Sequence, residues 1–175
     1  MSTSSQPKYD LSTSIDSRVA QVVSARGLKD AVHVFEASTA SASDAAAALS
    51  VDVAQIGKSI AFRGDDFIYV VLLSGSLRVD KAKLRDVTKS KKMQSIDGEV
   101  LEKELGYSPG GVSPLYLPSV AKLLVDESIE RYDLIYVSAG TTTSVIGLTS
   151  GERKEIFGTE RFDLSVTVAD SLEDN

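Results

Sequence analysis

The 175-residue chain contains no cysteine and a single histidine, His33. The lack of cysteine excludes disulfides and thiolate chemistry, and one histidine cannot form the His/Cys clusters that bind zinc. The chain also lacks an apolar run of about 18 residues, the length that a membrane-spanning helix needs. Its Ser-rich start, residues 1–8, has no apolar segment of the kind found in secretion signals. We therefore expect a cytoplasmic protein that needs neither a metal nor another cofactor and does not enter a membrane.

The composition is typical of one compact domain. Of the residues, 42% are hydrophobic and 25% are charged, and the chain is long enough to bury a core but short for two domains. We expect a single domain over residues 13–168. A flexible N-terminus (1–12) precedes it, and an acidic tail (169–175) follows.

The distribution of charge is uneven. A formal net charge of −6 argues against a protein that coats nucleic acid nonspecifically, because such binding needs many cation–phosphate contacts. Six of the 19 basic residues nevertheless lie within twelve positions: Lys81, Lys83, Arg85, Lys89, Lys91 and Lys92. This cluster is either a solvated helix face or a positive track for a nucleic-acid backbone.

Hydrophobic periodicity and capping residues predict a mixed α+β fold. Helices are expected at 14–26, at 45–49 after Ser43 or Asp44 as N-cap, at 80–87 and at 97–106, with shorter helical turns near 52–55, 127–131 and 150–157. Strands are expected at 31–36, 58–63, 67–73, 115–117, 120–125, 133–138, 143–148 and 161–168. In this scheme Lys58 stands at the start of a strand.

The segment from Gly106 to Pro114, GYSPGGVSP, is the most informative local feature. Gly110 and Gly111 lie between Pro109 and Pro114, so a stiffened loop presents two residues without side chains. Such a loop can approach a ligand closely and direct successive amides at a carbonyl or oxyanion. The alternative is a helix C-cap followed by a tight turn.

Five segments occur in an order that resembles the YbaK/EbsC family, also called the prolyl-tRNA synthetase-associated or trans-editing domain family. They are GKSIAF (57–62), SGSLRVDKAKL (74–84), GYSPGGVSP (106–114), VDESI (125–129) and YVSAGTTTSVIGLT (136–149). The resemblance covers residues 30–168 and implies a mixed, partly barrel-like sheet flanked by helices. It also implies hydrolysis of mischarged aminoacyl-tRNA by a free-standing editing protein, with an aminoacyl-tRNA synthetase as a further partner.

The resemblance assigns the principal polar role to Lys58. It implies that this lysine lies in the editing pocket and engages the phosphate of the terminal adenosine or the region of the scissile ester. Taken alone, a lysine on an apolar strand is more often an edge charge or a snorkelling side chain. A phosphate-binding P-loop is excluded, because Asp52 stands where that motif requires its first glycine.

The remaining expected site residues also follow from the resemblance. Gly110 and Gly111 would bind the oxyanion or carbonyl, aided by their loop neighbours Ser113 and Pro114. The strand end with Ser138 and Gly140 would line the same pocket, Gly140 leaving room for substrate. The segment with Thr39 and Ser41 would border the amino acid, although helix capping explains these two residues equally well. The basic residues Lys81, Lys83, Arg85, Lys91 and Lys92 would contact the acceptor stem.

Several points stay open at the level of sequence. Thr141–Thr143 stand where one branch of the family has an Arg-Gly pair, so contacts of that arginine cannot be carried over. His33 is expected to be a strand residue rather than a base, and no Ser/His/Asp set is present. Positioning of a water beside the activated ester would then suffice for hydrolysis. The removed amino acid is expected to be small, such as Ala, Ser or Thr. Two other functions stay open: a noncatalytic aminoacyl-tRNA or synthetase-binding module of this fold, and an unrelated small-molecule-binding domain.

Overall fold

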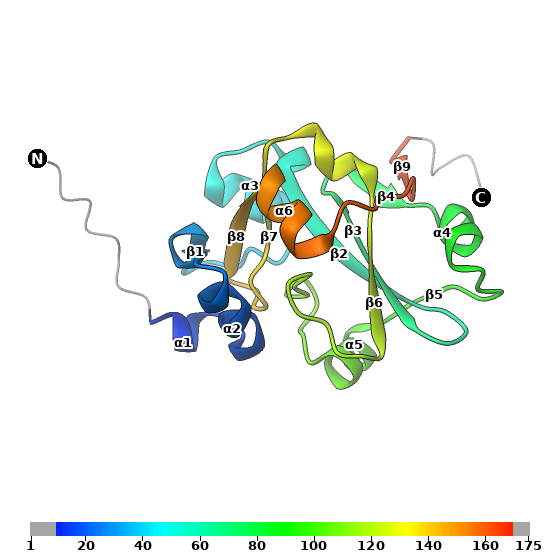
Figure 1. Ribbon diagram of the computed structural model, residues 1–175, viewed down its shortest axis with the longest axis horizontal. Helices are drawn as coiled ribbons and strands as arrows, with labels where there is room; N and C mark the ends of the chain where they lie inside the picture. Colours follow the sequence, from blue (N-terminus) through cyan, green and yellow to red (C-terminus); the bar gives the residue numbers. More distant parts are fainter. Residues whose placement is uncertain (1–9, 170–175) are drawn as a thin grey trace, which may run out of the picture.

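The computed structural model describes residues 10–169 and has one large mixed sheet with helices around it (Figure 1). The strands are β1 (Val32–Val34), β2 (Ile56–Arg63), β3 (Ile68–Ser74), β4 (Leu77–Val79), β5 (Gln94–Ser95), β6 (Ala121–Val125), β7 (Leu134–Ser138), β8 (Ser144–Thr149) and β9 (Ser165–Thr167). The α-helices are α1 (Leu11–Ser14), α2 (Ser17–Ala25), α3 (Ala42–Leu49), α4 (Lys81–Thr88), α5 (Gly98–Leu105) and α6 (Ser150–Phe157). Three 3₁₀ turns complete the described chain: η1 (Lys29–Ala31), η2 (Val53–Gln55) and η3 (Glu127–Arg131).

The main sheet has the strand order β1-β8-β7-β2-β3-β6, and β5 pairs with β2. Its β2–β3 and β7–β8 neighbours are antiparallel hairpins, whereas β2 with β7 and β3 with β6 run parallel. The fold is therefore α+β, as the sequence predicts. The order begins at β1 and finishes at β6 without pairing between them, so the sheet is open rather than closed into a barrel. A separate ladder joins β4 to β9.

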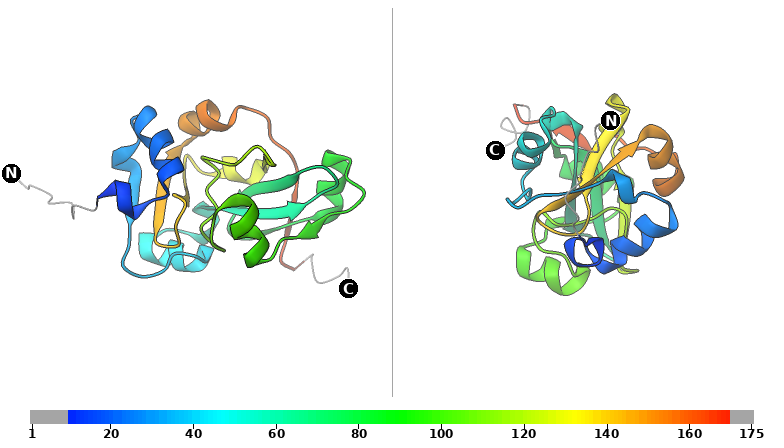
Figure 2. Two further views of the ribbon diagram at one scale, coloured as in Figure 1. Left: turned by 90° about the horizontal axis from the view of Figure 1, so that it is seen from below. Right: turned by 90° about the vertical axis from the view of Figure 1, so that its left-hand side faces the viewer.

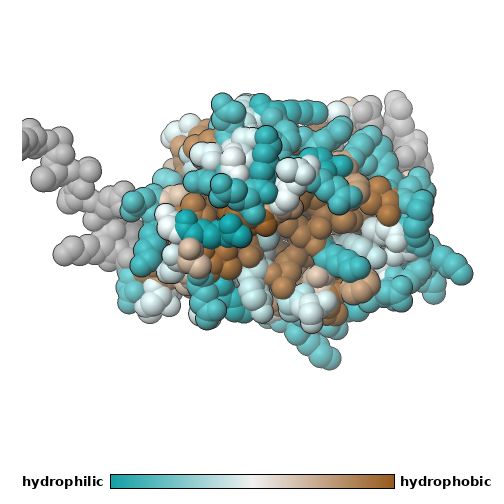
Figure 3. Space-filling view, in the orientation of Figure 1, coloured by the Kyte–Doolittle hydropathy of each residue, from teal (hydrophilic) through white to brown (hydrophobic). Residues whose placement is uncertain are grey.

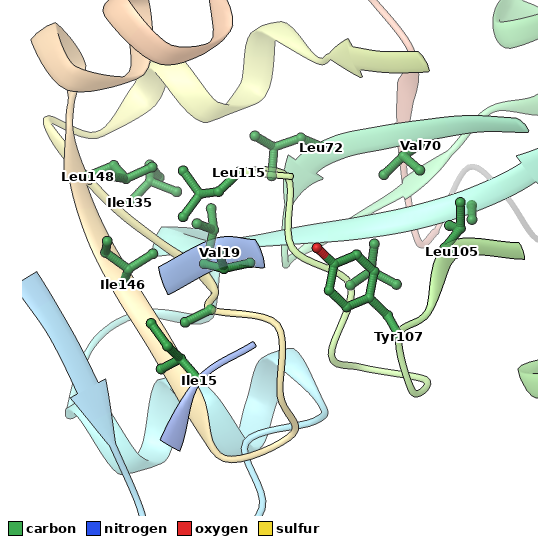
Figure 4. Close-up of a cluster of buried hydrophobic side chains, with 14 of the residues drawn as sticks. Ile15, Val19, Val70, Leu72, Leu105, Tyr107, Leu115, Ile135, Ile146 and Leu148 are labelled. Carbon is green, nitrogen blue, oxygen red and sulfur yellow. The ribbon is translucent and has the colours of Figure 1, made fainter. Parts of the chain in front are cut away.

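The core lies on both faces of β3, all seven residues of which are buried. One face carries the largest apolar cluster, to which α2, α5 and the loop after α5 contribute. Figure 4 shows part of this cluster, with Val19 of α2 close to Leu115 and Ile135, and Tyr107 on the side of Leu105 and Val70. The opposite face packs against α4 through Leu84 and against Leu164 near the C-terminal end of the described chain. In the space-filling view, apolar residues gather in the middle of the molecule and hydrophilic residues surround them (Figure 3).

Several element boundaries differ from the prediction for local reasons. The helix expected at 14–26 begins only at Ser17, because the Asp16 carboxylate caps it by accepting from the amides of Arg18 and Val19. Residues 11–12, expected to be flexible, belong to α1. Helix α3 is capped by Ser41 instead of Ser43 or Asp44. Strand β2 begins at Ile56, so Lys58 is its third residue and not its first.

Two expected strands are absent or shortened. Residues 115–117 lie in the loop after α5, where Pro114 and Pro118 interrupt the amide donors that a ladder requires. The strand expected at 161–168 is reduced to β9 and one bridge between Phe162 and Asp126. The very short strands β4 and β5 were not predicted. Most of the expected flexible N-terminus (1–9) and acidic tail (170–175) lie outside the described residues.

Candidate active site

A split in the main sheet creates the candidate site. Strands β2 and β7 pair only at Ile56↔Tyr136 and Gly57↔Val137. Strand β2 has two edges, and β3 occupies one of them from Gly57 to Arg63. Strands β7 and β5 therefore share the opposite edge, where β5 pairs with Phe62 and Arg63. Residues 58–60 therefore have no partner strand on this edge. A cavity of about 270 Å³ opens at this position, near the lower limit of about 300 Å³ for common ligand pockets.

Five segments form the walls of the cavity. Strand β2 contributes residues 56–60, β7 contributes 136–138, and β8 contributes Ser144 and Val145. The segment leading into α3 contributes residues 39–41, and α3 itself adds Ala42 and Ala45. The loop after α5 contributes Gly110 and Val112. The cavity thus brings together Gly110 of the loop after α5, Lys58 of β2 and Ser138 at the end of β7.

Lys58 is the one charged residue among those lining the cavity. It is half-buried, and its Nζ donates to the carbonyl oxygen of Gly75 at 3.4 Å. Burial lowers the pKa of this ammonium below its ordinary value, and the positive charge of Arg78 lowers the pKa further. No carboxylate lines the cavity to compensate this charge. Lys58 is therefore available to a phosphate or to a developing oxyanion.

The loop after α5 is built to hold its backbone in one shape. Helix α5 ends at Leu105, and its C-cap, Gly106, has a φ of 75°. The Tyr107 hydroxyl then donates to the Tyr116 carbonyl at 2.7 Å, which closes the loop over nine residues. Within this closed loop the amides of Gly110 and Val112 have no hydrogen-bond partner among the described residues. These two amides are the available donors for a carbonyl or oxyanion.

Gly111 departs from its expected role. Its N–H donates to the carbonyl of Ser108 at 2.8 Å, and Gly111 does not line the cavity. The prediction that its amide binds an oxyanion is therefore corrected: Val112 supplies the second free amide. Gly110 keeps its place, but it also touches the segment before α3. Its φ is +80°, and a Cβ there would lie 2.7 Å from the Cβ of Ala40.

Three other expected contacts are not in the cavity lining. Ser113 is fully buried, and its hydroxyl accepts from the amide of Leu115. Pro114 adjoins it in the same loop and also lies outside the lining. Gly140 has a φ of +95°, and a Cβ there would overlap the Cβ of Asp16. This glycine therefore allows the strand end to pack against the cap of α2, which corrects the expectation that it makes room for substrate.

The turn between β7 and β8 ties the cavity walls together. The carbonyl of Thr142 accepts from the amide and hydroxyl of Thr39. The hydroxyls of Thr141 and Ser144 lie 2.5 Å apart, and Ser138 Oγ accepts from the amide of Gly140. The threonine run thus has a positioning role in the fold of the site.

His33 is an exposed residue of β1. It pairs with Val145 of β8, and its ring meets the edge of the Tyr136 ring with centroids 5.9 Å apart. His33 does not line the cavity.

The basic cluster lies away from the cavity. Helix α4 and α3 occupy opposite ends of the long β2–β3 hairpin in both Figure 1 and Figure 2. The amides of Lys91 and Lys92 donate to the Asp65 carboxylate at the hairpin turn. Seven residues of extended chain separate Asp65 from Lys58, which corresponds to roughly 20 Å. Lys83 pairs with Asp163 at 2.8 Å and also donates to the Ser165 carbonyl, so its ammonium already has partners.

Residues 36–155 match the family described as the aminoacyl-tRNA editing domain. The chain belongs to the aminoacyl-tRNA editing domain family. The protein YwhH of Bacillus subtilis is 32% identical over 69% of this chain and 77% of its own length. EbsC of Enterococcus faecalis, named for deacylation of Cys-tRNA(Pro) and Cys-tRNA(Cys), is 28% identical over 66% of this chain and 76% of its own length.

Two further similar proteins have names that refer to the aminoacylation of tRNA with proline. A proline–tRNA ligase of Lactobacillus helveticus is 30% identical over 54% of this chain, which corresponds to 17% of the ligase. A solved structure described as a trans-editing enzyme for prolyl-tRNA synthetase aligns with a TM-score of 0.76 and 28% identity, covering 86% of this chain and 96% of that one. The α+β fold of this editing domain therefore agrees with that of the trans-editing enzyme.

No helix within residues 10–169 combines the length and the apolar character needed to cross a membrane. Within the same residues, no three His, Cys, Asp or Glu side chains form a group that could hold a metal ion.

Sequence reasoning missed several cavity residues. Ser59, Tyr136, Val112 and the alanines before and within α3 line the cavity but were not proposed. Ser59 is the residue among these that sequence reasoning could most easily have found, because it directly follows Lys58 in the segment GKSIAF. The alanines carried no chemical signal and could be placed only by the fold.

Proposed function

We propose that the protein hydrolyses the ester bond of mischarged aminoacyl-tRNA in trans and so releases the wrong amino acid from the terminal adenosine. One observation carries the proposal: a half-buried lysine without a carboxylate partner shares a cavity with two uncommitted loop amides. Membership of the editing-domain family supports this function, as do the deacylation named for EbsC and the trans-editing described for the structural relative.

The cavity groups suit ester hydrolysis. When a water attacks the ester carbonyl, negative charge develops on the carbonyl oxygen. The amides of Gly110 and Val112 would donate to this oxyanion, and Lys58 would stabilise it or hold the adjacent phosphate. No carboxylate or histidine lines the cavity, so we assign help with the proton of the water to the neighbouring ribose hydroxyl of the substrate. The ribose oxygen that leaves takes up a proton, which yields a free amino acid and tRNA.

The cavity walls favour a small amino acid. Ala40, Ala42, Ala45 and Val112 supply short side chains around a volume of about 270 Å³. We propose alanine, serine, threonine or cysteine as the removed residue and expect bulky amino acids to be retained on their tRNA.

The decisive assay measures free amino acid released from a panel of mischarged tRNAs. Wild-type protein is expected to accelerate release from at least one tRNA that carries a small amino acid. Binding of aminoacyl-tRNA without any accelerated release would contradict the proposal and favour a noncatalytic binding module of the same fold.

Lys58→Ala is expected to lower kcat/KM at least tenfold in this assay, a loss of about 1.4 kcal/mol of transition-state stabilisation. Lys58→Met is the matched control for shape, since it retains most of the apolar stem without the charge. Both variants should remain folded, because burial lowers the pKa of Lys58 and its charge does not stabilise the fold. Lys58→Arg should also be impaired, because the guanidinium fork is wider than an ammonium. A wild-type rate in folded Lys58→Ala would remove this residue from the mechanism.

A further inference from the structure

Ser59 follows Lys58 on β2, and both residues line the cavity. The side chain of Ser59 nevertheless projects from the opposite face of the sheet. Successive side chains of a strand alternate between faces, so Ser59 shares a face with Gly57 and Ala61. A Cβ at Gly57 would meet Val137 and Leu72, which belong to the large core cluster. The same cluster contains Val112 of the amide loop. Ser59 therefore stands on the loop side of the split, and Lys58 stands on the opposite side.

The hydroxyl of Ser59 differs from the other serine and threonine hydroxyls of the cavity. Four of the five already have partners within the described chain. Thr39 donates to the Thr142 carbonyl, Ser41 accepts from the Asp44 amide, Ser138 accepts from the Gly140 amide, and Ser144 pairs with Thr141. Ser59 Oγ is shielded from solvent and has no partner among the described residues. A buried hydroxyl without a partner costs free energy, which a ligand can recover by binding it.

The charges in the cavity indicate which part of a substrate reaches Ser59. An aminoacyl ester carries an α-amino group close to the reacting carbonyl, and this group needs a hydrogen-bond acceptor. No carboxylate lines the cavity, and Lys58 would repel a protonated amine. The neutral oxygen on the face away from Lys58 is therefore the more favourable acceptor.

We propose that Ser59 is a substrate-binding residue whose Oγ accepts a hydrogen bond from the α-amino group of the aminoacyl ester. The inference rests on the proposed deacylase function and extends it by assigning the orientation in which the substrate binds. The amino group would lie on the Ser59 side of the split, away from the positive charge of Lys58. Ser59 would thus distinguish aminoacyl esters from simple acyl esters.

The test compares two minimal substrates. One is the aminoacyl-adenosine ester of the amino acid that the tRNA panel selects, and the other is its counterpart with hydrogen in place of the α-amino group. Ser59→Ala is expected to lower kcat/KM for the aminoacyl ester about tenfold relative to wild type. The same variant should leave kcat/KM for the desamino ester within about twofold of wild type, because that substrate has no amino group to lose.

Thermal melting separates this role from a structural one. Ser59→Ala removes a hydroxyl that has no partner, so the melting temperature should stay the same or rise. Ser128→Ala is the matched control, because Ser128 is a buried serine outside the cavity whose hydroxyl accepts from the Ser74 amide at 3.0 Å. This control should lower the melting temperature and leave kcat/KM unchanged at temperatures where the variant is folded.

The possible failures are distinct. If wild type hydrolyses the aminoacyl ester and Ser59→Ala does so equally well, the role of Ser59 is wrong while the deacylase function stands. An equal loss on both esters would overturn the assignment to the α-amino group. If wild type hydrolyses no mischarged tRNA, the proposed function itself fails.

Discussion

The burial of Lys58 gives the reaction a testable pH dependence. Burial and then Arg78 lower its pKa from the ordinary 10.5. The lysine therefore loses its charge in a pH window below 10.5. Because the unfolded chain binds this proton more tightly than the folded protein, the stability cost of the charge shrinks as pH rises through that window.

We expect the ratio of wild-type to Lys58→Ala rates to fall as pH is raised toward 10.5. The charged ammonium stabilises the oxyanion, and the neutral amine does so less. Both rates are measured by release of free amino acid. The spontaneous alkaline hydrolysis of the ester is measured without enzyme and subtracted from each rate. A ratio that does not change up to this pH would show that the charge of Lys58 is not what assists the reaction.

The two glycines of the amide loop should respond differently to alanine. Gly110→Ala forces a side chain into a φ of +80° and against Ala40, and the left-handed conformation alone costs about 1–2 kcal/mol. Gly111→Ala meets ordinary to tight contacts, 3.2 Å from the Ser108 carbonyl and 3.3 Å from Thr141, and retains its N–H. We therefore expect a large loss of both melting temperature and kcat/KM for Gly110→Ala and a small one for Gly111→Ala. The reverse order would disprove this description of the loop.

At the scale of elements, one side chain joins α2 to the amide loop. Arg18 donates to the carbonyls of Leu105 and Gly106 at the end of α5, each at 3.0 Å. Its guanidinium lies 4.5 Å from the ring centroid of Tyr107 and 5.2 Å from that of Tyr116, the two residues that close the loop. An ion pair with Asp16 orients it. The geometry of the free amides therefore depends on the packing of α2.

Arg18→Met is expected to lower kcat three- to tenfold with a smaller change in KM, because a loosened loop aims its amides poorly. Steady-state kinetics on aminoacyl-tRNA would separate the two constants. Arg153→Lys is the control for loss of a buried arginine, since Arg153 donates to four carbonyls away from the cavity: those of Asp133, Leu148, Ile129 and Tyr132. It should lower the melting temperature without lowering kcat of the folded protein. Equal kinetic effects of both changes would reduce the role of Arg18 to general stability.

At the scale of the whole molecule, Lys91 and Lys92 lie at the turn of the β2–β3 hairpin, and the candidate cavity lies at the other end of β2. This separation suits a tRNA whose terminal adenosine enters the cavity while its stem contacts the basic surface. The net charge of −6 makes such a local positive surface more important for binding.

Changing both Lys91 and Lys92 to Ala should raise KM for aminoacyl-tRNA and flatten the dependence of log affinity on log salt. Each lost phosphate contact is expected to reduce that slope by roughly 0.7 to 0.9. Hydrolysis of aminoacyl-adenosine, which has no stem, should not change. Lys154→Ala on α6 is the control variant, because it removes an exposed lysine outside the cluster. Unaltered salt dependence would mean that tRNA docks elsewhere.

Local signals in the sequence were sufficient for most of the elements. Asp80 and Asp97 cap α4 and α5 as predicted, because an N-cap acts through amides two or three residues away. The apolar run at 67–73 identified the buried central strand β3 for a similarly local reason. Short strands such as β4 and β5 escaped prediction, because their partners β9 and β2 are distant in sequence.

The sequence by itself determined the α+β class and, through its ordered motifs, indicated the family, and it singled out Lys58 and Gly110 as candidate site residues. Only the tertiary structure decided how the cavity that both residues line is built. The cavity exists because β2 and β7 separate after two paired residues, and no local pattern encodes a separation between strands that lie about 80 positions apart. The same packing committed the amide of Gly111 to a turn, placed Gly140 against Asp16 and left the hydroxyl of Ser59 without a partner.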